Sequence, residues 1–186
     1  MKPITTSVYT FSDLIEGDFL YVDKTAAIHE LIRTYKGQYF LARPRRFGKS
    51  LLISTLKAIF QGRRELFGGL FLASTDYNWK PYPVIHLDLG TAAAQTPEEL
   101  EEHLRYAINR NAKEYGIALT RERAAGRFLE LVETLADRDG KIVILVDEYD
   151  KPLLGHLGQP TVTAIQTLLK QFYSVIKTTE TGRHWT

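Results

Sequence analysis

The stretch Arg43–Ser50 constrains the fold of this chain more strongly than any other part of the sequence. Its residues are Arg-Pro-Arg-Arg-Phe-Gly-Lys-Ser, and they follow a short apolar-rich segment, Gln38–Leu41, that favours a strand. Residues at the spacing of one helix face come directly after it: Leu51, Leu52, Thr55, Leu56 and Ile59. Backbone N–H groups at the start of such a helix, together with the helix dipole, favour a bound anion. The succession of strand, loop and helix therefore predicts a phosphate-binding loop.

Three residues of this loop have predicted roles in holding a nucleoside triphosphate. Gly48 lets the backbone approach the phosphates, Lys49 places its ammonium between the β- and γ-phosphates, and the Ser50 hydroxyl ligates Mg²⁺. The usual pattern is G-x-x-x-x-G-K-[ST], and here an arginine stands at the first glycine. A basic surface turn is the structural alternative. The predicted nucleotide-binding set is Arg43, Pro44, Arg45, Arg46, Phe47, Gly48, Lys49, Ser50 and Leu51.

Three arginines, Arg43, Arg45 and Arg46, crowd the predicted helix entrance. Their like charges repel one another unless an anion lies nearby, so we expect at least one of them to contact phosphate. A solvated basic turn is the alternative.

A second group of candidate residues follows the clearest predicted strand, Lys141–Asp147. This strand is a continuous β-branched run of the kind that is buried on both faces of a parallel sheet. Asp147 lies at its carboxyl end, where α/β folds place their ligand crevices, and is predicted to hold Mg²⁺ through water. Glu148 is predicted to be catalytic by polarising water for attack on the γ-phosphate, with Lys49 stabilising the charge that develops. The alternative is that the two acids merely end a strand and start a turn.

The remaining patterns predict alternating helices and strands. A helix follows Asp23-Lys24-Thr25, a strand covers Pro83–Leu89, and further helices cover Pro97–Tyr115, Arg121–Arg138 and Thr163–Lys177. Alternation of this kind implies an α/β domain with a mostly parallel sheet. We expect one domain over residues 1–186, with residues 178–186 as a disordered tail.

Composition excludes several classes of function. The chain has 186 residues, and its net charge of +2 is too small for global electrostatic capture of nucleic acid. It has no cysteine, which excludes disulfide scaffolds, thiolate metal sites and cysteine nucleophiles. The apolar run Ile142–Val146 is far shorter than the roughly 20 residues of a membrane span, and Met1–Thr6 lacks the apolar core of a secretory signal. We therefore expect a cytoplasmic protein without a membrane segment.

Two aromatic or polar clusters leave alternatives open. Tyr77, Trp79 and Tyr82 either close a loop over the core or stack on bases. The segment Tyr21–Thr25 either lies near an adenine or serves as a helix cap through Asp23.

Four blocks of the sequence, in order, resemble the bacterial and archaeal AAA-ATPase-like family. They are Tyr21–Thr25, Arg43–Leu51, Tyr82–Ile85 and Val146–Pro152, and the strings RPRRFGKS and VDEYDKP are the specific ones. The resemblance implies that Arg43 belongs to the family's own version of the loop. It also implies a P-loop NTPase fold, a three-layer sandwich in which an extra strand separates the phosphate-loop strand from the Asp-Glu strand.

Family members usually continue into a further part of the ATPase core and often into a C-terminal nuclease-like domain. The family has another strand, ending in a polar sensor residue, where this chain has Thr178–Thr186. We therefore expect an N-terminal fragment, truncated before the last strands of its sheet. In such a fragment Gln38–Leu41 and Lys141–Asp147 must pair directly or leave backbone groups unpaired.

The resulting expectation is an Mg²⁺-ATP-binding P-loop domain whose ancestral activity is ATP hydrolysis, impaired by the truncation. Two alternatives stay open: a switch or scaffold that binds ATP without efficient turnover, and a nucleic-acid-binding module that uses the Arg43–Arg46 cluster. The expected partners are ATP, a protein partner or a second copy, and nucleic acid through a C-terminal domain. No guanine-reading Asn/Thr-Lys-x-Asp motif is present, which favours ATP over GTP.

Overall fold

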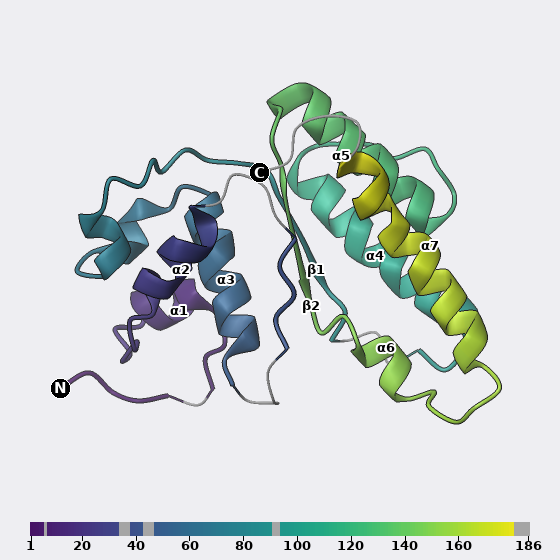
Figure 1. The fold of residues 1–186 in the computed structure, drawn as a ribbon, viewed down its shortest axis with the longest axis horizontal. Helices are drawn as coiled ribbons and strands as arrows, with labels where there is room; N and C mark the ends of the chain where they lie inside the picture. Colours follow the sequence, from purple (N-terminus) through teal and green to yellow (C-terminus); the bar gives the residue numbers. More distant parts are fainter. Residues whose placement is uncertain (6, 34–37, 43–46, 91–93, 181–186) are drawn as a thin grey trace. The chain divides into compact units, whose positions relative to one another are not determined.

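The computed structural model describes residues 1–5, 7–33, 38–42, 47–90 and 94–180, which fall into two compact units (Figure 1). The first unit lies within Met1–Val84 and the second begins at Ile85. Each unit has its own buried side chains, and each carries one group of the predicted site residues.

The first unit consists of short helices. They are α1 (Phe11–Glu16), α2 (Thr25–Ile32), α3 (Lys49–Phe60) and two 3₁₀ helices, η1 (Arg64–Phe67) and η2 (Phe71–Ser74). The hydroxyl of Thr10 caps α1 by accepting a hydrogen bond from Asp13 N. Aromatic rings fill the interior, with Phe67 between Phe11 at 4.6 Å and Trp79 at 4.9 Å between centroids. The Trp79 ring also contacts Tyr77 edge-on, so these two aromatic residues belong to the packing of this unit.

The second unit is built on two parallel strands, β1 (Val84–Asp88) and β2 (Val143–Asp147). Helices α4 (Pro97–Glu114) and α5 (Ala124–Asp139) connect them, because parallel strands require a long crossover. A short helix α6 (Lys151–Leu154) and the long helix α7 (Val162–Glu180) follow β2 (Figure 1).

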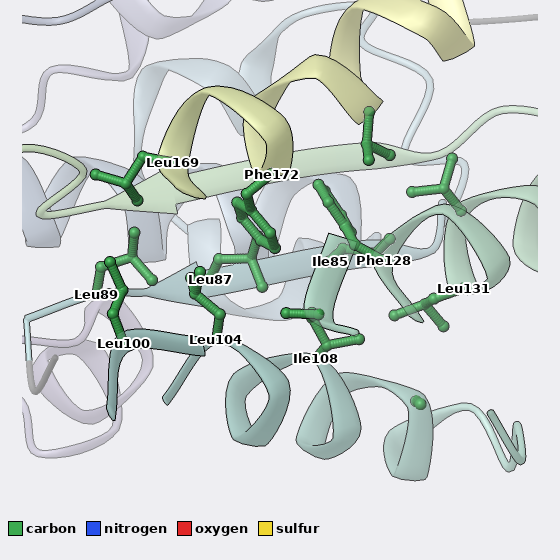
Figure 2. Close-up of a cluster of buried hydrophobic side chains, with 14 of the residues drawn as sticks. Ile85, Leu87, Leu89, Leu100, Leu104, Ile108, Phe128, Leu131, Leu169 and Phe172 are labelled. Atoms are coloured by element: carbon green, nitrogen blue, oxygen red, sulfur yellow. The ribbon is translucent and has the colours of Figure 1, made fainter. Parts of the chain in front are cut away.

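Apolar side chains from α4, α5, α7 and the strands form the core of the second unit (Figure 2). Leu100, Leu104 and Ile108 recur every fourth residue on α4 and are fully buried, as the amphipathic pattern requires. The rings of Phe128 and Phe172 stack with centroids 4.9 Å apart, which joins α5 to α7. Each of these buried side chains stabilises the fold by roughly 1.5–3 kcal/mol.

Most of the predicted elements are confirmed. The two strands of the second unit and its three long helices lie where the sequence patterns place them, within a few residues at each end. The α/β class with a parallel sheet is therefore confirmed, whereas the described residues form a sheet of two strands and the wider three-layer sandwich stays a prediction.

Two predictions are wrong. Gln38–Leu41 is not a strand: Tyr39 and Phe40 are 56% and 72% exposed, and the described sheet is β1 with β2 alone. An apolar run becomes a strand only where a neighbouring strand accepts its backbone hydrogen bonds, and the described sheet does not include this run. The expected tail also begins too early, because α7 continues to Glu180; the first helix breaker after Lys177 is Gly182.

None of the helices in the described part of the chain combines the length and hydropathy that crossing a bilayer requires.

Candidate functional site

Gly48 sets the geometry of the predicted phosphate loop. It is the residue that caps α3, and its φ of 70° and ψ of 27° lie in the left-handed region. A Cβ added to Gly48 would meet no atom within 4 Å, so the backbone conformation, and not a lack of space, requires glycine here. Arg43, Pro44, Arg45 and Arg46 lie outside the described residues.

Lys49, Ser50 and Leu51 form the first turn of α3. The first intrahelical bond of this end runs from Leu52 N to Gly48 O at 3.0 Å. The backbone N–H groups of the three preceding residues therefore have no carbonyl of their own helix to bond. Lys49 and Ser50 are half-buried, Phe47 is exposed, and the positive end of the helix dipole lies at the same place.

The segment Tyr21–Thr25 ties α2 to η2. Asp23 Oδ1 accepts hydrogen bonds from Thr25 N and from the Thr25 hydroxyl at 2.8 and 2.7 Å, and its Oδ2 accepts one from Phe71 N at 2.8 Å. The buried Thr25 hydroxyl oxygen accepts a further bond from Leu72 N at 3.0 Å. Burial acts to raise the pKa of Asp23, but these hydrogen bonds prevail and lower it. The N-cap residue of α2 is Lys24, whose side chain makes no capping hydrogen bond, and Asp23 fixes the start of the helix from the preceding position through its bonds to Thr25.

Asp147 ends β2 in a buried position, with 8% of its surface exposed. Its main-chain oxygen accepts a hydrogen bond from Leu89 N at 3.1 Å, which extends the pairing of the two strands. Its Oδ1 accepts a hydrogen bond from Glu148 N at 2.9 Å. One carboxylate oxygen is thus fixed by the turn that follows the strand.

Glu148 has a φ of 52°, in the left-handed region that side chains other than glycine rarely adopt. The turn is held because Lys151 N donates to Glu148 O at 3.0 Å, just before α6. A non-glycine residue in this region stores about 1–3 kcal/mol of strain, and such residues cluster at functional sites. Of the two predicted acids, Glu148 is the one whose backbone geometry is unusual.

Asp88 is a third carboxylate at the same end of the sheet, and sequence reasoning did not single it out for the site. Its Oδ1 accepts a hydrogen bond from Gly90 N at 2.8 Å. A Cβ on Gly90 would lie 2.8 Å from this oxygen and 3.5 Å from Glu148 Cγ, so the ends of both strands meet around this glycine. The available signal was its place next to the carboxyl end of the predicted strand Pro83–Leu89.

His156 fixes the chain that follows β1. It is 4% exposed, with its Nε2 2.7 Å from Ala94 O and its Nδ1 3.0 Å from the Thr161 hydroxyl oxygen. Since a carbonyl only accepts, Nε2 carries the proton and Nδ1 accepts from Thr161. This histidine is structural, because both ring nitrogens are used to hold the chain.

No three His, Asp or Glu side chains come together to hold a metal ion within the described ranges. Phe47–Leu51 belong to the first unit, and Asp88, Asp147 and Glu148 belong to the second.

Comparisons with known proteins identify the family. The model of the AAA-ATPase-like family, described as predicted AAA-ATPase, matches residues 5–184, a range that includes both Gly48-Lys49-Ser50 and Asp147-Glu148. An uncharacterized protein in the vnfD 5′ region of Azotobacter chroococcum mcd 1 is 38% identical over 180 residues, which cover 95% of this chain and 34% of the relative. The chain thus spans about a third of that relative's length. No solved structure matches the chain. The family match over nearly the whole sequence places this chain in the AAA-ATPase-like family of predicted AAA-ATPases.

Proposed function

We propose that this chain is the Mg²⁺-ATP-binding core of a P-loop ATPase with a three-layer sandwich fold. The observation that carries the proposal is the left-handed Gly48 at the start of α3, followed at once by Lys49 and Ser50, in a member of a family of predicted ATPases. The triphosphate lies against the first turn of α3, where N–H groups without helical partners favour an anion. Lys49 contacts the β- and γ-phosphates, and the loop Arg43–Leu51 surrounds them.

The residues present fit a magnesium ion. The Ser50 hydroxyl and the Asp147 carboxylate are the hard oxygen donors that Mg²⁺ prefers. Asp147 Oδ1 already accepts a bond from Glu148 N, so Oδ2 is the oxygen that we assign to a metal-bound water. When bound, the ion supplies charge neutralisation at the β- and γ-phosphate oxygens.

Glu148 is the general base in this proposal. It takes a proton from water as the water oxygen bonds to the γ-phosphorus and the bond from that phosphorus to the bridging oxygen of ADP breaks. Lys49 offsets the negative charge on the transferring group. The fixed turn from Glu148 to Lys151 keeps this carboxylate at the end of β2.

Titration with labelled ATP tests the binding step. Lys49→Ala should weaken Mg²⁺-ATP binding about a hundredfold or more, because a charge-assisted contact to two phosphates is lost. Lys57→Ala is the matched control: it removes a lysine from the last turn of the same helix and should leave affinity unchanged. Equal affinity of the wild type and Lys49→Ala would refute the proposal. A parallel titration with GTP measures the base preference.

Steady-state phosphate release tests turnover and separates the enzyme from an ATP-binding switch. Glu148→Gln should retain ATP affinity and lose phosphate release by a factor of about 10²–10⁴, the usual contribution of a general base. A wild-type chain that binds ATP without releasing phosphate indicates the switch. We propose that contacts with nucleic acid or a protein partner need the parts of the relative beyond the 34% of its length that this chain covers.

A further inference from the structure

An open cavity of about 410 Å³ lies in the second unit where α4 leads into α5. Its polar lining comes from Asn109, Lys113 and Arg127, and its apolar lining includes Ala112, Ile117 and Leu119. The volume is within the range of sites for small molecules. The cavity lies at the end of α4 opposite to Thr96, and the 18 residues of that helix make it about 27 Å long.

One hydrogen-bond donor of Arg127, which lines this cavity, has no partner among the described residues. Its Nη1 donates to Asn109 Oδ1 at 2.9 Å, whereas its Nε is buried and has no hydrogen-bond partner. A guanidinium has only hydrogen-bond donors, so Arg127 Nε needs an acceptor from another group. Buried donors are nearly always paired in native proteins, and an unpaired one points to a missing water, ion or ligand.

Lys113 brings a second positive charge to the same cavity. It lies one helical turn after Asn109 and so shares its face of α4. Neither Lys113 nor Arg127 forms an ion pair with a carboxylate in the part of the chain that the structure describes. The Glu130 carboxylate lies one turn beyond Arg127. It accepts hydrogen bonds from the Thr120 hydroxyl and from the N–H groups of Thr120 and Arg121.

From this arrangement we infer that the cavity binds a small organic anion. Its carboxylate or phosphate lies between Arg127 and Lys113, and a short apolar portion lies against Ile117 and Leu119. The two cations without a counter-ion supply the charge, and a guanidinium recognises either anion with paired hydrogen bonds. This site is separate from the proposed nucleotide site and does not depend on it.

Amide chemical-shift titration of the whole chain tests the inference, with sodium isobutyrate and inorganic phosphate as probes at constant ionic strength. We expect saturable shifts around Asn109, Gly116–Leu119 and Arg127 with at least one probe. Saturation with isobutyrate alone identifies a carboxylate ligand, and saturation with phosphate alone a phosphate ligand. Shifts that stay linear with both probes overturn the inference.

Three variants locate the binding. Arg127→Met should weaken it about tenfold or more, since a charge-assisted hydrogen bond is lost. Arg123→Met, an exposed position one turn earlier on the chain that does not line the cavity, should change it less than about twofold. Lys113→Met leaves the hydrogen bond between Arg127 and Asn109 intact and should weaken binding about threefold or more. It replaces Arg127→Met in the test if that variant does not fold. Unchanged affinity in Arg127→Met or Lys113→Met overturns the inference.

Discussion

Two non-glycine residues of the described chain, Asp18 and Glu148, have a positive φ. Asp18 lies in the exposed turn after α1, where such a conformation is common for aspartate. Glu148 instead follows the buried Asp147 directly, and a glutamate gains nothing from this conformation by itself. The strain is maintained because the two flanking hydrogen bonds, from Glu148 N to Asp147 Oδ1 and from Lys151 N to Glu148 O, fix the turn. A single residue thus carries the strongest local sign of function in the second unit.

The Asp23 carboxylate makes the stability of the first unit depend on pH in the acid range. Because its pKa is lowered in the folded chain from the ordinary value of 3.8, its stabilising effect is complete above that value and is lost as the pH falls through the lowered one. We expect the free energy of unfolding to fall as the pH falls below 3.8, and to fall less in Asp23→Asn. Asp23→Asn should also cost about 1 kcal/mol at neutral pH, because the amide nitrogen cannot accept one of the hydrogen bonds that the two carboxylate oxygens accept.

Urea denaturation at several pH values measures both effects. The control is Asp76→Asn, at an exposed position of the same unit. If Asp23→Asn and the wild type lose stability in parallel as the pH falls, the hydrogen bonds to Phe71 and Thr25 do not stabilise the carboxylate.

At the scale of the elements, the Asn111 side chain hydrogen-bonds the backbone of β1 as a neighbouring strand would. Its Oδ1 accepts a hydrogen bond from His86 N at 2.8 Å, and its Nδ2 donates to His86 O at 2.9 Å and to Ala107 O at 2.8 Å. Asn111 is 3% exposed, so its amide makes these bonds from a buried position. The side chain covers part of a strand edge that would otherwise present unpaired groups.

Asn111→Ala should therefore cost about 1–3 kcal/mol, because two part-buried backbone groups of His86 lose these hydrogen bonds at once. Arg110→Ala, at the exposed position next to it, should change stability by less than about 0.5 kcal/mol. Both values come from urea denaturation monitored by far-ultraviolet circular dichroism. A cost below about 1 kcal/mol in Asn111→Ala would mean that water replaces the amide and that the strand edge is not buried in solution.

The contrast between β2 and Gln38–Leu41 shows why a short apolar run does not always form a strand. Lys141–Asp147 is a longer β-branched run, and β1 gives it a partner. Gln38–Leu41 has four residues, two of them aromatic, and whether it becomes a strand depends on a neighbour that its own sequence does not encode.

At the scale of the whole molecule, nucleotide binding should stabilise both units if the phosphate loop and the carboxylates hold the same ligand. Mg²⁺-ATP at about 100 times its Kd adds about 2.7 kcal/mol to the folded state. For a chain of 186 residues this corresponds to a rise in Tm of about 5–11 °C. Lys49→Ala should abolish the rise, and Lys57→Ala should keep it.

Differential scanning calorimetry checks this expectation. When one ligand contacts both units, their unfolding is coupled and moves together to higher temperature. A shift confined to one of two resolved transitions would mean that the nucleotide contacts a single unit, and it would contradict the assignment of Asp147 and Glu148 to the same ligand as Lys49.

Local signals in the sequence determined much of this protein. Amphipathic periodicity predicted α4, α5 and α7, a β-branched run predicted β2, and the Gly-Lys-Ser triplet with the apolar face after it predicted the start of α3, because each is fixed by neighbouring residues. Two of the sequence blocks that resemble the family, Arg43–Leu51 and Val146–Pro152, contain this triplet and the two acids at the end of β2. The contacts that only the tertiary structure decided join residues far apart in the chain: His86 to Asn111 across 25 positions and Thr25 to Leu72 across 47. Such contacts depend on how helices pack, and packing brings together side chains and backbone groups that no local pattern links.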